Sequence, residues 1–151
     1  MNNHVLLVED NPTDEKLTLR AFRQCGVPAD MAVVRDGSEA LDYLFRANQY
    51  SGRDLTGDPA LILLDLSIPK VNGHEVLRRL RADERTKLIP VVILTSSRED
   101  EDVIRSYSLG ANAYVRKPVA FAEFAEAAKT IALFWLRLNE RAPGRIPGLN
   151  P

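Results

Sequence analysis

Five polar side chains that could bind a ligand or react stand at the ends of short apolar runs in this sequence: Glu9, Asp10, Asp65, Thr95 and Lys117. Short, unbroken apolar runs bounded by turn residues are typical of strands that are covered on both faces of a parallel sheet. Right-handed strand–helix–strand connections bring the carboxyl ends of all such strands to one edge. We therefore expect three carboxylates, one hydroxyl and one ammonium to meet at the edge where open α/β sheets bind ligands.

The three carboxylates predict a site for a hard divalent cation. Close acidic groups raise one another's pKa unless a positive charge offsets them. Mg²⁺ prefers oxygen ligands and keeps several waters, so Glu9, Asp10 and Asp65, with the backbone carbonyl of Ser67, form a suitable partial shell. Zinc and copper are disfavoured, because no Cys or His stands at this edge of the predicted sheet. His74, at the start of a predicted helix, is expected to be a solvated turn residue rather than a phosphate relay.

A half-filled magnesium shell suits a ligand that carries phosphoryl oxygens. Lys117 would hold those oxygens as a point charge, and Thr95 would donate its hydroxyl to them. Carboxylates can act as nucleophiles and form acyl phosphates, and Asp65 has the central strand and the metal beside it. Each residue alone has a plainer explanation as a helix cap or a solvated charge. Their joint arrival at one edge favours the functional interpretation.

Strand-like and helix-like segments alternate along the chain. The predicted strands and helices are 4–8, 12–25, 31–34, 37–45, 61–64, 75–81, 91–94, 99–109, 113–115 and 121–138. This alternation calls for a parallel sheet with helices on both faces. The segment 47–60 has no clear periodicity, so it is either a loop or an extension of the second helix.

Length, composition and charge exclude several classes of protein. The 151 residues suit one domain, which we place at 1–140 with a flexible tail at 141–151 and no effector domain. The net charge of −1 gives no reason to expect a nucleic-acid or membrane surface. A single cysteine, Cys25, excludes an internal disulfide and a thiolate cluster. Because no apolar run reaches the roughly 18 residues of a membrane span and no signal peptide precedes the first strand, we expect a cytoplasmic protein.

The predicted last helix carries more apolar surface than packing on a sheet requires. Residues spaced by threes and fours form its expected core stripe: Phe121, Phe124, Ala128, Ile131 and Trp135. Further apolar residues lie on its other sides: Leu133, Phe134, Leu136 and Leu138. We therefore predict a homodimer through this helix and its neighbours, with Phe134, Trp135 and Leu138 at the interface.

Four segments closely resemble the receiver domain of two-component response regulators. They are 5–14 (VLLVEDNPTD), 61–73 (LILLDLSIPKVNG), 91–97 (VVILTSS) and 110–118 (GANAYVRKP). The resemblance covers almost the whole chain. It implies a doubly wound (βα)5, flavodoxin-like three-layer sandwich with the parallel sheet order 2-1-3-4-5.

The resemblance also implies a role for each matching residue. Asp65 becomes the phosphoacceptor, Lys117 the phosphate-binding lysine, and Thr95 and Tyr114 the switch hydroxyl and switch aromatic. The Mg²⁺ site would consist of Glu9, Asp10, Asp65 and the Ser67 carbonyl. The family further implies a cis peptide bond between Lys117 and Pro118.

Two features are similar to stand-alone receivers that are paired with phytochrome-type histidine kinases. These are the long loop before Pro59 and the segment Phe134-Trp135-Leu136. The implied function is that of a phosphorelay switch, not an enzyme, that takes a phosphoryl group from such a kinase. Self-phosphotransfer and slow autodephosphorylation would go with it, and the output would be a protein–protein contact.

Three other functions fit parts of the pattern. A haloacid-dehalogenase-type phosphatase has a second carboxylate two residues after its nucleophile, where this chain has Ser67. A flavodoxin-like FMN protein needs a phosphate-binding loop after the first strand, where Glu9 and Asp10 would repel phosphate. The third alternative is a receiver-like scaffold that is never phosphorylated. The intact acidic set, with Thr95 and Lys117, argues against it.

Overall fold

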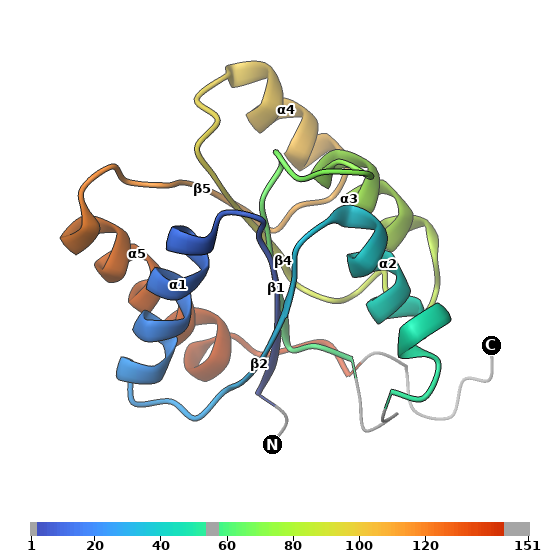
Figure 1. The fold of residues 1–151 in the computed structure, drawn as a ribbon, viewed down its shortest axis with the longest axis horizontal. Helices are drawn as coiled ribbons and strands as arrows, with labels where there is room; N and C mark the ends of the chain where they lie inside the picture. The colour runs from blue at the N-terminus through green and yellow to red at the C-terminus, as the bar shows by residue number, and fades with distance from the viewer. Residues whose placement is uncertain (1–2, 54–57, 144–151) are drawn as a thin grey trace.

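The computed structural model describes residues 3–53 and 58–143. In this part of the chain five parallel strands form one sheet in the order β2-β1-β3-β4-β5. Figure 1 shows helices on either side of this sheet. The strands are β1 (His4–Val8), β2 (Asp30–Val34), β3 (Leu61–Leu64), β4 (Val91–Thr95) and β5 (Ala113–Arg116). The predicted fold class and strand order are confirmed.

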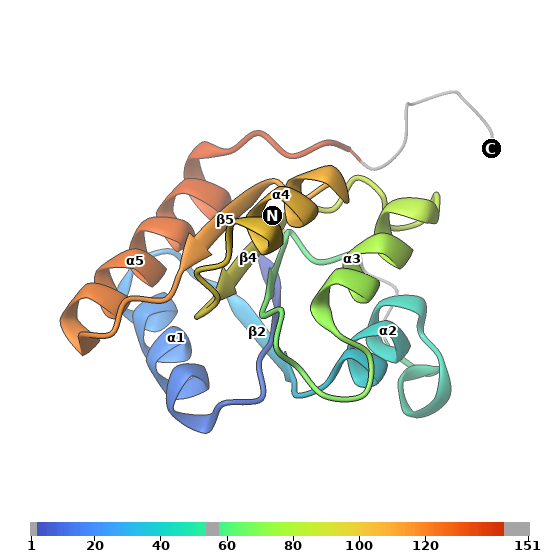
Figure 2. The same cartoon turned by 90° about the horizontal axis from the view of Figure 1, so that it is seen from above.

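Helices cover both faces of the sheet. They are α1 (Pro12–Gln24), α2 (Gly37–Phe45), α3 (Gly73–Ala82), α4 (Asp100–Ser108) and α5 (Phe121–Leu133), with the 3₁₀ turn η1 (Asn48–Tyr50) and the π-helical segment η2 (Phe134–Leu138). α1 and α5 cover one face, α2 and α3 the other, and α4 lies beside α3 (Figures 1 and 2). None of these helices is long and apolar enough to cross a bilayer.

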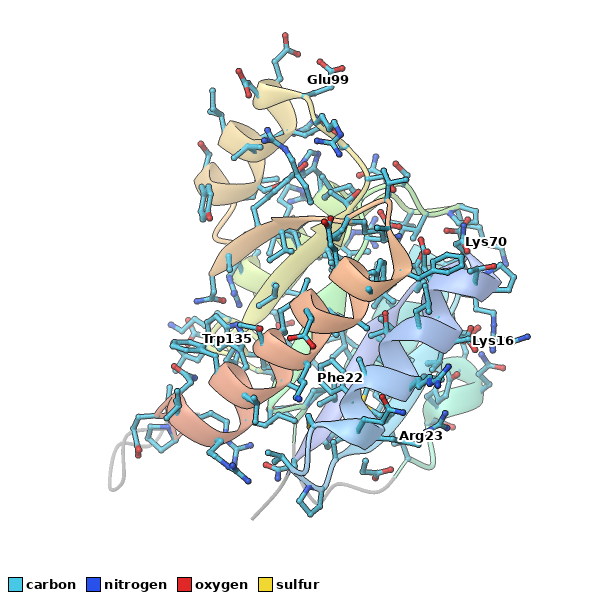
Figure 3. The ribbon with its side chains drawn as sticks, turned by 90° about the vertical axis from the view of Figure 1, so that its left-hand side faces the viewer. Lys16, Phe22, Arg23, Lys70, Glu99 and Trp135 are labelled. Atoms are coloured by element: carbon cyan, nitrogen blue, oxygen red, sulfur yellow. The ribbon has the colours of Figure 1, made fainter. Side chains whose placement is uncertain are left out.

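The apolar runs are continuous because both faces of the sheet are buried. Successive side chains of a strand point to opposite faces. Leu6 and Ile62 therefore pack in the core beneath α2 and α3, while Leu7 and Leu63 pack in the core beneath α1 and α5. Figure 3 looks onto the side of the molecule formed by α1 and α5, where Phe22 lies between these two helices.

The segment after α2 is a loop rather than a longer helix. α2 ends at Phe45, and Arg46 takes a left-handed conformation that cannot continue a helix (φ 53°). The short turn η1 follows, and the extension of the second helix that we considered is wrong. Residues 54–57 of this loop and 144–151 of the predicted tail lie outside the described residues.

The core stripe of the last helix differs at both ends from the expected one. Phe121 is 69% exposed, and Leu136 is buried where we expected Trp135. Leu136 lies four residues after the buried Ala132 and eight after the buried Ala128, on the same side of the helix. The C-terminal end is a π-helical segment, in which the Asn139 N–H donates to the Phe134 carbonyl five residues earlier. Trp135 is half-buried, on the side of α5 away from α1 (Figure 3).

Candidate functional site

The site forms where the chain changes direction across the sheet. β1 pairs with both β2 and β3, so its carboxyl end lies at the topological switch point. The backbone ladder continues one residue beyond the strands, because the Glu9 N–H donates to the Val34 carbonyl and the Asp65 N–H to the Val8 carbonyl. The residues that follow β1 and β3 are thereby held side by side.

Three carboxylates converge at this point. Glu9, Asp10 and Asp65 each offer one oxygen, and these oxygens all lie within 4.8 Å of one another. Glu9 is 1% exposed, and burial raises its pKa to about 7. Glu9 and Asp65 are buried and Asp10 is exposed. Carboxylates this close together need positive charge, and an all-oxygen donor set fits a hard divalent ion. Ser67 lies alongside and donates its N–H to Asp65 Oδ1 at 3.1 Å, while the ligand role of its carbonyl stays a prediction.

Lys117 is the cation of the site. The backbone ladder between β4 and β5 carries on to its N–H, which donates to the Thr95 carbonyl. Its Nζ lies 2.7 Å from Glu9 Oε1 and 2.8 Å from both Asp14 Oδ2 and Asp65 Oδ2. All three ammonium donors therefore have acceptors. Burial alone would lower the pKa of Lys117, but the three carboxylates raise it.

Asp65 is held as a carboxylate by donors on both of its oxygens. Thr95 Oγ1 donates to Oδ1 at 2.7 Å, beside the Ser67 N–H, and Lys117 donates to Oδ2. Burial alone would raise the pKa of Asp65, but the bonds from Lys117, Thr95 and Ser67 lower it below its ordinary value. A buried and ionised carboxylate with one oxygen directed at an ammonium is suited to act as a nucleophile.

The two predicted switch residues stand on the neighbouring strands β4 and β5. Thr95 is fully buried, and its hydroxyl donates to Asp65 Oδ1. The carboxylate is the best acceptor within its reach. Tyr114 is half-buried and packs on the α2/α3 core, while its Oη donates to the Ser97 carbonyl at 3.2 Å.

Sequence reasoning missed one residue of the site, Asp14, and misjudged the burial of His74. Asp14, in the first turn of α1, contacts Lys117 directly; an acidic residue there is ordinary helix composition, so it gave no signal. His74 is 8% exposed and its Nε2 lies 3.0 Å from Ser106 Oγ of α4, so the prediction of a solvated turn residue is wrong. α4 packs over the start of α3 and covers it.

The peptide bond between Lys117 and Pro118 is trans, like every other peptide bond in the part of the chain described, so the cis bond implied by the resemblance is not present. The Lys117 ammonium reaches Asp65 with this backbone conformation.

A five-stranded, doubly wound sheet with acidic side chains, a hydroxyl and a lysine at the carboxyl ends of its strands is typical of ligand-binding α/β domains. The particular family is set by the sequence model of the response regulator receiver domain, which matches residues 5–129. The chain belongs to this family.

Two curated relatives match over most of their own length. The probable methanogenesis regulatory protein FilR2 of Methanothrix harundinacea is 44% identical over 140 residues, covering 93% of this chain and 87% of the relative. Response regulator Rcp1 of Synechocystis is 36% identical over 132 residues, covering 87% and 88%. The chain is thus similar in extent to both.

Solved structures agree with the fold. The phosphorylated cyanobacterial phytochrome response regulator RcpA superposes with a TM-score of 0.87 at 37% identity, over 93% of this chain and 99% of that one. The Mn²⁺-bound form of Rcp1 also gives 0.87, at 34% identity over 93% and 99%. The bacteriophytochrome response regulator RtBRR is 50% identical, with a TM-score of 0.75 over 95% and 86%.

Proposed function

We propose that this receiver domain accepts a phosphoryl group on Asp65 from a phosphohistidine of a histidine kinase. The observation that carries the proposal is the buried, ionised Asp65 with Lys117 Nζ 2.8 Å from Oδ2, next to a cluster of carboxylates that fits a divalent ion. An aspartyl-phosphate phosphatase would need an acid two residues after the nucleophile, where Ser67 stands.

The transfer uses groups of this chain in defined roles. An oxygen of Asp65 attacks phosphorus, the bond from phosphorus to the histidine nitrogen breaks, and the imidazole leaves with its electron pair. Lys117 Nζ then donates to an oxygen of the transferred group, where negative charge gathers. Little covalent work is left to the protein, so positioning and electrostatics dominate the rate.

Glu9, Asp10, Asp65 and the Ser67 carbonyl would hold the divalent ion, and Mg²⁺ is the ion we propose. When bound, it supplies positive charge that offsets the charge of the carboxylates and the phosphoryl oxygens. The Mn²⁺-bound form of the relative Rcp1 and the all-oxygen donor set of this chain support the assignment.

The proposed switch runs from Asp65 to the surface through Thr95 and the loop after β4. Thr95 would exchange its bond to Asp65 Oδ1 for a bond to a phosphoryl oxygen and move with it. Ser97 follows in this loop: its carbonyl accepts from Tyr114 Oη, and its Oγ donates to Asp102 of α4. A shift of this loop would therefore change which conformations of Tyr114 and α4 are populated. The surface formed by α4, β5 and α5 would change with them.

We further propose a phytochrome-type kinase as the phosphodonor and residues 1–140 as the receiver unit. The kinase assignment is supported by the names of the relatives: RcpA is a phytochrome response regulator and RtBRR a bacteriophytochrome response regulator. The test is to compare phosphotransfer from a purified phytochrome-type kinase and from an unrelated histidine kinase. Faster transfer from the unrelated kinase would contradict the pairing.

A homodimer through η2, the segment that follows α5, is also proposed. Leu138 is 73% exposed and Phe134 is 45% exposed, with the half-buried Trp135 between them. Exposed apolar side chains grouped at one helix end are typical of a contact surface. Sedimentation should show a dimer that Phe134→Ser with Leu138→Ser converts to a monomer. A monomeric wild type at high concentration, phosphorylated or not, would remove this proposal.

The main proposal is tested by mass spectrometry after incubation with acetyl phosphate and Mg²⁺. The wild type should gain one phosphoryl group and Asp65→Asn should gain none. Asp30→Asn, at an exposed position at the opposite end of β2, is the matched control and should behave as the wild type. A full adduct on Asp65→Asn would move the acceptor elsewhere, and an unmodified wild type would favour the scaffold alternative.

A further inference from the structure

Asp14 is a third carboxylate on Lys117 and has no part in the proposed metal set. Its Oδ2 accepts from Lys117 Nζ at 2.8 Å, the same distance as Asp65 Oδ2. We propose that Asp14 is a positioning residue, which holds the ammonium of Lys117 in place while the phosphoryl group is transferred. This inference rests on the proposed phosphotransfer at Asp65.

The backbone of Asp14 is fixed from both sides. Its N–H donates to Oδ1 of the N-cap residue Asn11 at 3.0 Å, and Thr18 Oγ1 donates to its carbonyl at 2.8 Å. Thr18 is fully buried on the inner face of α1. The Asp14 side chain therefore starts from a rigid point, and its carboxylate is preorganised for Lys117.

Helix capping does not account for the carboxylate. Asn11 already supplies the side-chain cap of α1, accepting from the N–H groups of Thr13 and Asp14. Among the described residues, the Asp14 carboxylate accepts a hydrogen bond from the Lys117 ammonium instead. Its neighbour Glu15 shares the favourable first turn of α1 but pairs with Arg35 instead. The two acids thus have the same helix environment and different partners.

The reaction changes what Lys117 can bind. Each of its three N–H donors is used in this structure, on Glu9, Asp14 and Asp65. Once Asp65 carries the phosphoryl group, the donor on Asp65 Oδ2 is needed by a phosphoryl oxygen. Glu9 belongs to the cluster proposed for the divalent ion, so its oxygens are shared. Asp14 is neither the phosphoacceptor nor part of the cluster proposed for the divalent ion, so it keeps the ammonium within reach of Asp65 before and after the transfer.

The negative charge of Asp14 weakens binding of the phosphodonor, whereas its positioning of Lys117 raises the maximal rate. A further negative charge repels an anionic phosphodonor, so its removal would favour donor binding. A looser Lys117 lowers the maximal rate, because its ammonium spends less time at the phosphoryl oxygens. The dependence of the rate on donor concentration separates the two effects.

The test measures phosphorylation with acetyl phosphate at saturating Mg²⁺, as a function of donor concentration. Asp14→Asn keeps an oxygen acceptor for Lys117 but removes its negative charge, and we expect a maximal rate about 10-fold lower, which corresponds to about 1.4 kcal/mol. The half-saturating donor concentration should stay the same or fall. Asp14→Glu, which restores the charged acceptor, should recover part of the rate, and the control Glu15→Gln should match the wild type.

A second readout needs no reaction. The ¹H–¹⁵N signal of the Lys117 ammonium is visible only while its protons exchange slowly, so it should be present in the wild type and Glu15→Gln and lost in Asp14→Asn. Unchanged or faster maximal rates in Asp14→Asn, or an ammonium signal that persists, would overturn the role of Asp14. If the wild type and Glu15→Gln take up no phosphoryl group at all, the proposed function itself fails, and this inference with it.

Discussion

Removing the Lys117 ammonium should destabilise the protein in a way that reveals the charges around it. In Lys117→Met the carboxylates of Glu9 (1% exposed) and Asp65 (6% exposed) lose their shared cation while remaining buried. Deleting one partner of a buried ion pair costs about 3–5 kcal/mol. We take the lower figure, about 3 kcal/mol, because Glu9, with its pKa raised to about 7, can relieve the charge by binding a proton.

The loss should depend on pH with a defined sign. Without Lys117 the pKa values of both buried carboxyls rise above those in the unfolded chain, so the folded state binds more protons. Stability then increases as the pH falls, and the difference between variant and wild type should shrink from about pH 8 to about pH 5. A divalent ion replaces part of the missing charge, so Mg²⁺ should stabilise the variant at least as much as the wild type.

Calorimetry or thermal unfolding in EDTA and in Mg²⁺ measures these effects. A loss of about 3 kcal/mol corresponds to a fall in Tm of about 6–12 °C for a domain of this size. Lys129→Met, which removes an exposed lysine of α5, is the matched control and should change Tm little. A variant as stable as the wild type at about pH 8 in EDTA, or a deficit that grows toward pH 5, would refute the reasoning.

Two other predictions concern the packing behind the site. Gly37→Ala should lower the free energy of unfolding by about 3 kcal/mol or more, since a Cβ there would overlap the backbone carbonyl of Val71 in the loop that follows Asp65. Urea unfolding measures this loss, and Gly52→Ala, with open space around it, is the control. Equal stabilities of the two variants would contradict the packing. The pKa of His74 is lowered from 6.5 by burial and by Arg105, so the unfolded state binds the proton more readily and the contribution of His74 to stability should decrease as the pH falls below 6.5. His74→Gln should flatten this dependence in urea titrations, and an unchanged slope would assign it to other groups.

Much of the site could be predicted from the sequence because it follows from strand order and direction. Continuous apolar runs mark strands buried on both faces, and parallel strands bring their carboxyl ends to one edge. Glu9, Asp65 and Thr95 stand at such ends, so their meeting required no knowledge of how helices pack. Lys117 joins them because β5 lies beside β4 with its carboxyl end at the same edge.

Other features depended on the packing of helices, which no local pattern specifies. Asp14 reaches Lys117 from the first turn of α1, and His74 is buried because α4 lies over the start of α3. Leu136 rather than Trp135 is buried at the C-terminal end of the last helix, because spacings of threes and fours allow either residue and packing on the core selects one.

By itself, the sequence determined which elements form, in which order, and which residues end the strands, since backbone periodicity and chain direction are local properties. Only the tertiary structure decided how far a helix side chain reaches and which polar groups it meets, because helix orientation results from contacts between residues far apart in the chain. Lys117 illustrates both: its place at the edge follows from the strands, and its third carboxylate comes from a helix packed beside them.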